Sequence, residues 1–286
     1  MNKLLLSLTL FATLIFSSTS FAADKSIAMY SGHSTGGLST AFQTVVAEEL
    51  GKRGWDVDFK IIGNCGKVVN LLETSDKPIL AGWGADWNID TNICNRPPKA
   101  SNFIETTVIS ARLVCGPVGD TTFDLVTGKK YVIGVNQGQN HQVILAALGK
   151  KLDVEFKVVE YKNSGAIAKA MQAKEINAWY TTKGLVDHNA GKQRCVLGTL
   201  EKPAFGIVPL NTLLDTDNVY SSFVGYLTTN DKFSPELRAA LQKDVSEIVQ
   251  SKEYREKLAA KGSFVTDGDA AAQMSFINAT SRAFIK

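Results

Sequence analysis

The order of apolar patterns along the chain constrains its fold more than any other feature of the sequence. A short apolar run at residues 26–30 precedes a helical pattern over residues 38–50. An alternating run at 55–61, a short helical segment at 68–72 and an apolar run at 78–81 then follow. Repeated strand–helix–strand units of this kind predict a mainly parallel sheet with helices on both faces.

The second half of the chain repeats this plan. It predicts strands at 131–135, 154–159 and 176–180, and helices at 141–148 and 166–173. Two series of strand–helix units predict two α/β lobes with a ligand cleft between them.

Two strand-like segments connect these lobes in the prediction. The segment at residues 106–115 crosses to the second lobe, and the segment at 220–229 returns. We therefore expect lobe 1 to comprise residues 23–112 and about 222–286, and lobe 2 to comprise residues 113–221. The C-terminal helices, the first of which begins with Ser234 as its cap, belong to the first lobe and are expected to contact both.

The N-terminus has the pattern of a secretory signal peptide. A positive start at residues 1–3 precedes an apolar stretch at 4–16, and small residues flank Phe21. The apolar stretch is too short for a membrane span. We expect residues 1–22 to be removed, with cleavage after Ala22 or Ala23; an uncleaved anchor is the alternative.

The charge balance bears on the kind of ligand. The formal net charge of the whole chain is +3. Removal of Lys3, the only charged residue of the signal peptide, lowers it by one, to +2. The absence of a dense basic cluster argues against nucleic-acid binding, whereas the weak positive balance favours a small anionic ligand.

The cysteines suit an exported protein. Cys65, Cys94, Cys115 and Cys195 could form disulfides in three connectivities. We favour Cys65–Cys94 with Cys115–Cys195, and buried thiols are the alternative. Because no Cys-x-x-Cys pair occurs, a zinc site or a thioredoxin-like site is disfavoured.

Two polar turns are the main candidates for a binding site, one in each lobe. Residues 31–37 and residues 136–140 each follow a strand and precede a helix. Backbone N–H groups and the helix dipole favour an anion at such a place. The alternative is that these turns only cap their helices. Neither the Walker nor the Rossmann glycine spacing is present.

Histidines occupy both turns. His33 and His141 leave a two-histidine site open, although a hydrogen bond to ligand or backbone is the expected role of either. The chain has neither a Gly-x-Ser-x-Gly elbow nor a His-Glu-x-x-His motif, so no catalytic residue and no metal ligand are predicted.

Other candidates follow strands. Trp83 and Asp86 lie after one apolar run, where an aromatic ring can stack on a ligand or, alternatively, pack the lobe surface. Tyr180, Thr181 and Thr182 hold the matching place in the second lobe. Asn64 is a further candidate, with a simple turn former as its alternative.

Three stretches resemble one known family. "SGHSTGGLSTAFQTVVAEELGKRGW" resembles its Gly-Gly turn and first helix, "FKVVEYKNSGAIAKAMQAKEINAWY" its strand–turn–helix–strand unit, and "KFSPELRAALQKDVSEIVQSKEYREKLAAKGSF" its C-terminal helices. The family is that of the periplasmic solute receptors of tripartite tricarboxylate transporters, also called Bug receptors. Thr40 stands near the place of the family's Asp, and the glycine-rich stretch after Asn64 is reduced; these departures bear on the ligand more than on the fold.

The resemblance implies a two-lobed periplasmic binding protein fold of type II-like topology, with a mixed, mainly parallel sheet in each lobe. It implies a monomer without cofactor that binds a small organic carboxylate and delivers it to integral-membrane transporter subunits. It also implies that both turns hold one carboxylate, partly through water, while less regular positions contact the rest of the ligand. The predicted ligand-binding residues are Ser31, His33, Ser34, Thr35, Gly36, Asn64, Trp83, Asp86, Gln137, Gly138, Gln139, Asn140, Tyr180 and Thr181.

Two rival functions remain at this point. One is a receptor of the same fold for another anion or an amino acid, serving a different transporter. The other is an exported enzyme built around His33 and His141.

Overall fold

The computed structural model describes residues 25–33, 35, 37–85, 100–136, 141–182, 193–199, 207–214, 223–260, 263–265, 269 and 272. The predicted signal peptide lies outside the described residues. None of the helices in the described part is long and apolar enough to span a membrane.

The first sheet contains six strands in the order β12-β4-β11-β3-β1-β2. The strand β1 lies parallel to β2 and β3, whereas β11 lies antiparallel to both β3 and β4. The short edge strand β12 is antiparallel to β4. Their bounds are β1 Ser26–Ser31, β2 Asp56–Ile61, β3 Ile79–Ala85, β4 Phe103–Ser110, β11 Phe223–Thr229 and β12 Ser263–Phe264. A 3-10 turn, Ala100–Asn102, precedes β4.

The second sheet repeats this arrangement, in the order β10-β9-β5-β8-β6-β7. Here β6 lies parallel to β7 and β8, and β5 lies antiparallel to β8 and β9. The edge strand β10 is parallel to β9. Their bounds are β5 Arg112–Cys115, β6 Lys130–Asn136, β7 Glu155–Tyr161, β8 Ala178–Thr182, β9 Cys195–Gly198 and β10 Val208–Pro209.

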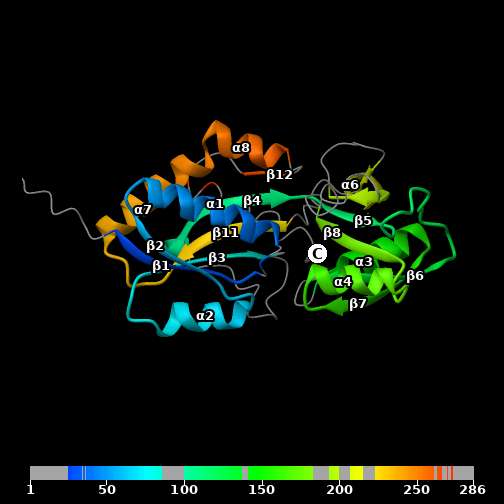
Figure 1. The fold of residues 1–286 in the computed structure, drawn as a ribbon. Coiled ribbons are helices and arrows are strands. Elements are labelled where there is room, and N and C mark those ends of the chain that lie inside the picture. The colour runs from blue at the N-terminus through cyan, green and yellow to red at the C-terminus, as the bar shows by residue number, and fades with distance from the viewer. Residues whose placement is uncertain are drawn as a thin grey trace, which may run out of the picture.

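The chain passes from the first sheet to the second at Ala111. Only Ala111 separates β4 of the first sheet from β5 of the second, so the strand expected at 106–115 starts earlier, at Phe103, and divides in two. We call the first sheet with its helices lobe 1 and the second sheet with its helices lobe 2. Figure 1 shows the lobes side by side, joined at β4 and β5. The two-lobed α/β prediction with mixed sheets is confirmed, and the lobe boundaries remain predictions.

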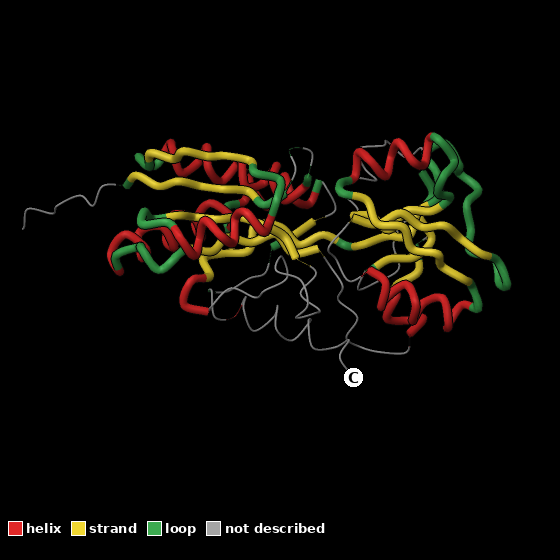
Figure 2. The backbone as a smooth tube through the Cα atoms, turned by 90° about the horizontal axis from the view of Figure 1, so that it is seen from below, coloured by secondary structure: helices red, strands yellow, loops and turns green. Residues whose placement is uncertain are grey.

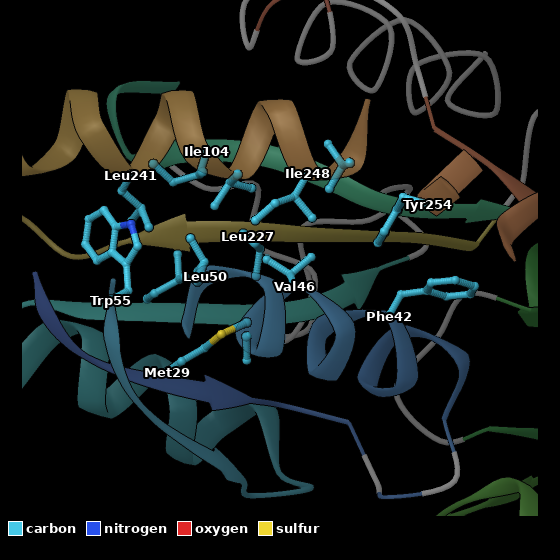
Figure 3. Packing of buried hydrophobic residues seen from close by; sticks show 14 of the residues in the cluster. Met29, Phe42, Val46, Leu50, Trp55, Ile104, Leu227, Leu241, Ile248 and Tyr254 are labelled. Atoms are coloured by element: carbon cyan, nitrogen blue, oxygen red, sulfur yellow. The ribbon is translucent and has the colours of Figure 1, made fainter. Parts of the chain in front are cut away.

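Helices cover both faces of the sheet in lobe 1 (Figure 2). On one face lie α1 (Leu38–Lys52), α7 (Pro235–Val249) and α8 (Lys252–Ala259), and on the other lies α2 (Cys65–Thr74). Figure 3 shows side chains of α1 and α7, among them Leu50 and Leu241, gathered around Leu227 of β11. Apolar residues at helical spacing thus build a core against the sheet.

Lobe 2 has a separate core on each face of its sheet. The helices α3 (His141–Leu152) and α6 (Leu210–Leu214) cover one face, where Leu145, Leu148 and Leu210 are buried. The helix α4 (Ser164–Gln172) covers the other face with Ile167 and Met171. The helix expected at 166–173 therefore begins two residues earlier, because Asn163 caps it by accepting a hydrogen bond from the Ala166 N–H.

Most of the helix starts described in full carry a side-chain cap. Ser234 caps α7 as predicted, and Ser251 caps α8. Asn64 caps α2. The helix α1 differs, because its N-cap is Gly37 in an extended conformation and no side chain caps it.

Candidate ligand-binding site

Pairing registers bring the carboxyl ends of the parallel strands in both lobes to the crossing. Thr182, the last residue of β8, pairs with Arg112, the first residue of β5. In lobe 1, Phe223 at the start of β11 pairs with Ser110 at the end of β4, and the next residue pairs with Ala85 at the end of β3. The carboxyl ends of the parallel strands therefore lie at the ends of the lobes that adjoin the crossing (Figure 1).

The side chain of Ser31 stabilises the turn that follows β1. Its buried hydroxyl lies 2.9 Å from the hydroxyl of Thr40 and accepts a hydrogen bond from the His33 N–H at 3.3 Å. The Gly32 N–H donates to the Gly82 carbonyl at 2.8 Å. These contacts give the Ser31 hydroxyl a structural task that the sequence did not indicate, and its predicted ligand contact remains a prediction.

The first turn of α1 presents backbone groups toward this region. The Ala41 N–H donates to the Gly37 carbonyl at 3.0 Å, which begins the helix. The first N–H groups of a helix have no partner within it, and here the capping residue has no side chain to serve them. No side chain therefore caps this helix at Gly37, and the alternative that the turn at residues 31–37 only caps α1 stays open. His33 is half-buried and Thr35 is exposed, while Ser34 and Gly36 lie outside the described residues.

In lobe 2, the helix α3 follows β6 in the same way. His141 begins α3 and is completely buried, with its ring edge-on to Tyr180 at 4.9 Å between centroids. Burial, with a smaller contribution from the positive charge of Arg112, holds the pKa of His141 well below its usual range. The imidazole is therefore neutral at pH 7. The intervening residues 137–140, which include the predicted Gln137, Gly138, Gln139 and Asn140, lie outside the described residues.

Buried polar side chains without hydrogen-bond partners gather at the strand ends. Thr181 and Thr182 end β8, and the hydroxyl of each is buried without a partner. The same holds for the side-chain oxygen of Asn136 at the end of β6 and for the hydroxyl of Ser110 at the end of β4. Because buried polar groups are nearly always paired in folded proteins, such a set indicates where a polar ligand or water completes the structure.

Arg112 belongs to this region, although sequence reasoning missed it. Its side chain is only 1% exposed. Its backbone N–H donates to the Thr199 hydroxyl at 2.7 Å, and its carbonyl accepts from the Thr199 N–H at 2.9 Å. In the sequence, Arg112 is a single basic residue that precedes an apolar run, which gives no sign of a binding role. Only its pairing with Thr182 shows that it lies near the crossing.

In the described part of the chain, no group of three or more His, Cys, Asp or Glu residues could hold a metal ion. The described contacts thus place a neutral histidine, a buried guanidinium, unpaired hydroxyls and two helix N-termini near one crossing. This is the chemistry of a site for a small anion.

Sequence comparison identifies no relative. No family model matches the chain, and no curated protein matches it. Solved structures do resemble it. The R. palustris protein Rpa4515 with adipate has a TM-score of 0.71 at 12% identity, over 90% of this chain and 93% of that one. MatC from Rhodopseudomonas palustris with bound malate has a TM-score of 0.70 at 12% identity, over 91% and 97%. The periplasmic binding protein BugD has a TM-score of 0.68 at 11% identity, over 91% and 95%.

The chain has the fold of a two-lobed periplasmic binding protein. Within this binding-protein fold, the strands β1 and β6 occupy equivalent places, because each is second from one edge of its sheet. Each leads into a helix that packs on its own sheet, α1 in lobe 1 and α3 in lobe 2.

Three further predicted site residues fall in the predicted lobe 1, namely Asn64, Trp83 and Asp86. The side-chain oxygen of Asn64 accepts from the Lys67 N–H at 3.0 Å, so Asn64 caps α2, a role that neither the ligand contact nor the alternative of a simple turn former had specified. Trp83 lies on β3 opposite Tyr226, and its side chain is outside the description. Asp86 lies outside the described residues. Ligand contacts of all three remain predictions.

One predicted disulfide is confirmed. Cys115 and Cys195 lie opposite each other on the antiparallel strands β5 and β9 and form a disulfide. Cys94 lies outside the described residues, so its pairing with Cys65 remains a prediction.

Proposed function

We propose that this protein is a periplasmic solute receptor that captures a small organic carboxylate and delivers it to a membrane transporter of the tripartite tricarboxylate type. One observation carries the proposal: in each lobe a parallel strand ends near the crossing and the N-terminus of the next helix follows it. Two such helix N-termini can hold an anion through backbone N–H groups and helix dipoles.

The comparisons support the proposed ligand class without naming the ligand. Two of the similar structures contain adipate and malate, which are dicarboxylates. The sequence resemblance to Bug receptors points to the same class of ligand and to the same kind of transporter. Export to the periplasm and a monomeric state are parts of this proposal.

Capture in this proposal requires closure of the lobes. In lobes joined by short crossing segments, small changes in a few backbone angles move one lobe against the other. A ligand that contacts both turns binds the closed form more tightly and shifts the population toward it.

A thermal-shift screen of the exported, purified protein tests the function. The panel consists of malate, succinate, adipate and citrate, with phosphate, glutamate and methionine for comparison. We expect at least one carboxylate to raise the melting temperature, because at one hundred times Kd a ligand stabilises the native state by about 2.7 kcal/mol. Calorimetry then gives the affinity.

The comparison compounds decide between the receptor functions. A response to phosphate or an amino acid alone, with none to the four carboxylates, contradicts the proposal and favours a receptor for that other ligand. Conversion of a bound compound to product, lost in His33→Ala, would instead establish the enzyme alternative.

A further inference from the structure

We propose that Arg112 and Thr182 together recognise one carboxylate of the ligand and thereby make the site selective for an anion. This inference rests on the proposed receptor function and adds to it Arg112, which sequence reasoning did not select, and a specific role for Thr182. Both residues lie in lobe 2 where the chain arrives from lobe 1.

The register of the sheet places the two side chains together. Arg112 of β5 and Thr182 of β8 are directly paired on neighbouring antiparallel strands. Side chains of directly paired residues project from the same face of a sheet, with their Cβ atoms about 5 Å apart. Tyr180, two residues before Thr182, shares this face and contacts the ring of His141 at the start of α3. The pair therefore lies beside the helix N-terminus that follows β6.

The chemistry of Arg112 fits a carboxylate. The guanidinium is always charged, and its planar fork of donors matches the two oxygens of a carboxylate. Its side chain is 1% exposed, so a contact with an anion is shielded from water. His141 beside it is neutral at pH 7, so it adds no second cation to this place.

The side chain of Thr182 supports the proposed anion site independently of Arg112. Its side chain is 5% exposed, and its hydroxyl has no hydrogen-bond partner. An unpaired buried hydroxyl destabilises a protein, and a valine of the same shape would avoid that penalty. The Thr182 hydroxyl makes no hydrogen bond that stabilises the fold, and its side chain projects from the same face of the sheet as Arg112. It is therefore suited to donate to an oxygen of a bound anion.

The decisive variant is Thr182→Val, because stability and binding should change independently. The probe is whichever of malate, succinate, adipate and citrate binds the wild type most tightly. We expect Thr182→Val to keep or raise the melting temperature of the protein without ligand and to weaken binding about tenfold, as loss of a hydrogen bond to a charged group does. Thr182→Ser, which keeps the hydroxyl, should bind within about threefold of the wild type.

Thr228→Val is the matched control. The Thr228 hydroxyl is also buried, but it donates to the Asn102 carbonyl at 2.9 Å, and its strand position pairs with Phe103 at the far end of β4 from the crossing. This variant should lower the melting temperature and leave the affinity for the same probe unchanged.

A second variant, Arg112→Met, removes the charge and keeps much of the length. If it folds, as circular dichroism shows, we expect its affinity to fall about a hundredfold, in keeping with loss of a charge-assisted interaction. If it does not fold, the Thr182 series decides alone.

The outcomes separate this inference from the proposed function. Carboxylate binding by the wild type with unchanged affinity in Thr182→Val, or in folded Arg112→Met, overturns the inference and leaves the receptor function standing. A fall in melting temperature of Thr182→Val equal to that of Thr228→Val gives the hydroxyl a structural role and also overturns it. No binding of any of the four carboxylates by the wild type overturns both.

Discussion

Glu105 on β4 is an acid enclosed in the core of lobe 1. Its side chain is fully buried, and burial raises its pKa from 4.5 to about 7. Ser246 on α7, the backbone of Thr106 and the charge of Arg255 on α8 favour the ionised form but do not outweigh the burial. The protonated form is therefore the one that the fold accommodates.

Glu105→Gln should abolish one pH dependence of stability. Because the folded pKa is raised, the native state binds more protons than the unfolded state between pH 4.5 and about 7. The raised pKa of Glu105 stabilises the native state fully below pH 4.5. This contribution to the unfolding free energy, up to about 3 kcal/mol, is lost as the pH rises through about 7. Urea unfolding of wild type and variant at pH 4.5, 6 and 8 measures it.

Because His141 also makes stability depend on pH, the wild type and Glu105→Gln must be compared with each other at each pH. The pKa of His141 is lowered in the fold by burial and then by Arg112, so it destabilises the native state as the pH falls below 6.5. This opposes Glu105 in the wild type but is common to both proteins and cancels in their difference. A difference in unfolding free energy that is constant from pH 4.5 to 8 would contradict the assignment of Glu105.

At the level of elements, α1 packs on the sheet through polar contacts near its N-terminus and through apolar contacts along the rest of its length. Near its start, Gln43 is buried and donates to the Ser39 hydroxyl at 2.8 Å. Gly82 of β3 lies against the Gln43 amide so closely that a Cβ there would come within 2.3 Å of it. The position of the first turn of α1 thus depends on a glycine in a neighbouring strand.

Gly82→Ala on β3 should therefore disturb the first turn of α1. Gly51→Ala, which lies in α1 itself, should not. We expect Gly82→Ala to lower the unfolding free energy by about 1–3 kcal/mol, since the buried Gln43 must shift, and to weaken ligand binding. An added Cβ at Gly51 meets no atom within 4 Å, so alanine there should stabilise by up to about 1 kcal/mol. Denaturant titration and calorimetry test both; wild-type stability in Gly82→Ala would show that Gln43 moves without cost.

At the scale of the whole molecule, each lobe has its own core and the disulfide belongs to lobe 2 alone. Clusters of buried residues in lobe 1 are separate from those in lobe 2. The bond between Cys115 and Cys195 links β5 to β9 within one sheet and encloses a sequence separation of 80 residues. It therefore restrains the unfolded chain without linking one lobe to the other.

Replacement of Cys115 and Cys195 by alanine should lower stability and spare function. Loss of a native disulfide costs about 2–5 kcal/mol. Because the bond does not connect the lobes, closure and ligand affinity should persist at temperatures where the variant is folded. Calorimetry at 15 °C with the carboxylate selected above measures the affinity, and a large loss there would show that the bond shapes the site.

Local patterns in the sequence were sufficient for much of the fold. Phe42, Val46 and Leu50 recur at helical spacing and do form the buried face of α1. Ser234, followed by proline and glutamate, does begin α7. Such signals are local, because caps and periodic faces depend on neighbours a few residues away.

The candidate site was predicted less completely, for a physical reason. Sequence reasoning selected Tyr180, Thr181 and Thr182 by their place after a strand but missed Arg112, which lies 70 residues before Thr182 in sequence and pairs with it in the sheet. It placed Ser31 at the ligand but did not indicate that the Ser31 hydroxyl contacts the hydroxyl of Thr40 in the fold. The ligand contact of Ser31 remains a prediction.

By itself, the sequence determined the elements, their alternation and the presence of two lobes, because propensity, capping and periodicity act over short distances. Only the tertiary structure decided that β5 and β11 each insert antiparallel into a sheet of otherwise distant strands, and that the resulting registers bring Arg112 beside Thr182 at the crossing. Strand order and register depend on burial of the whole sheet surface against its helices, and no local segment encodes that balance.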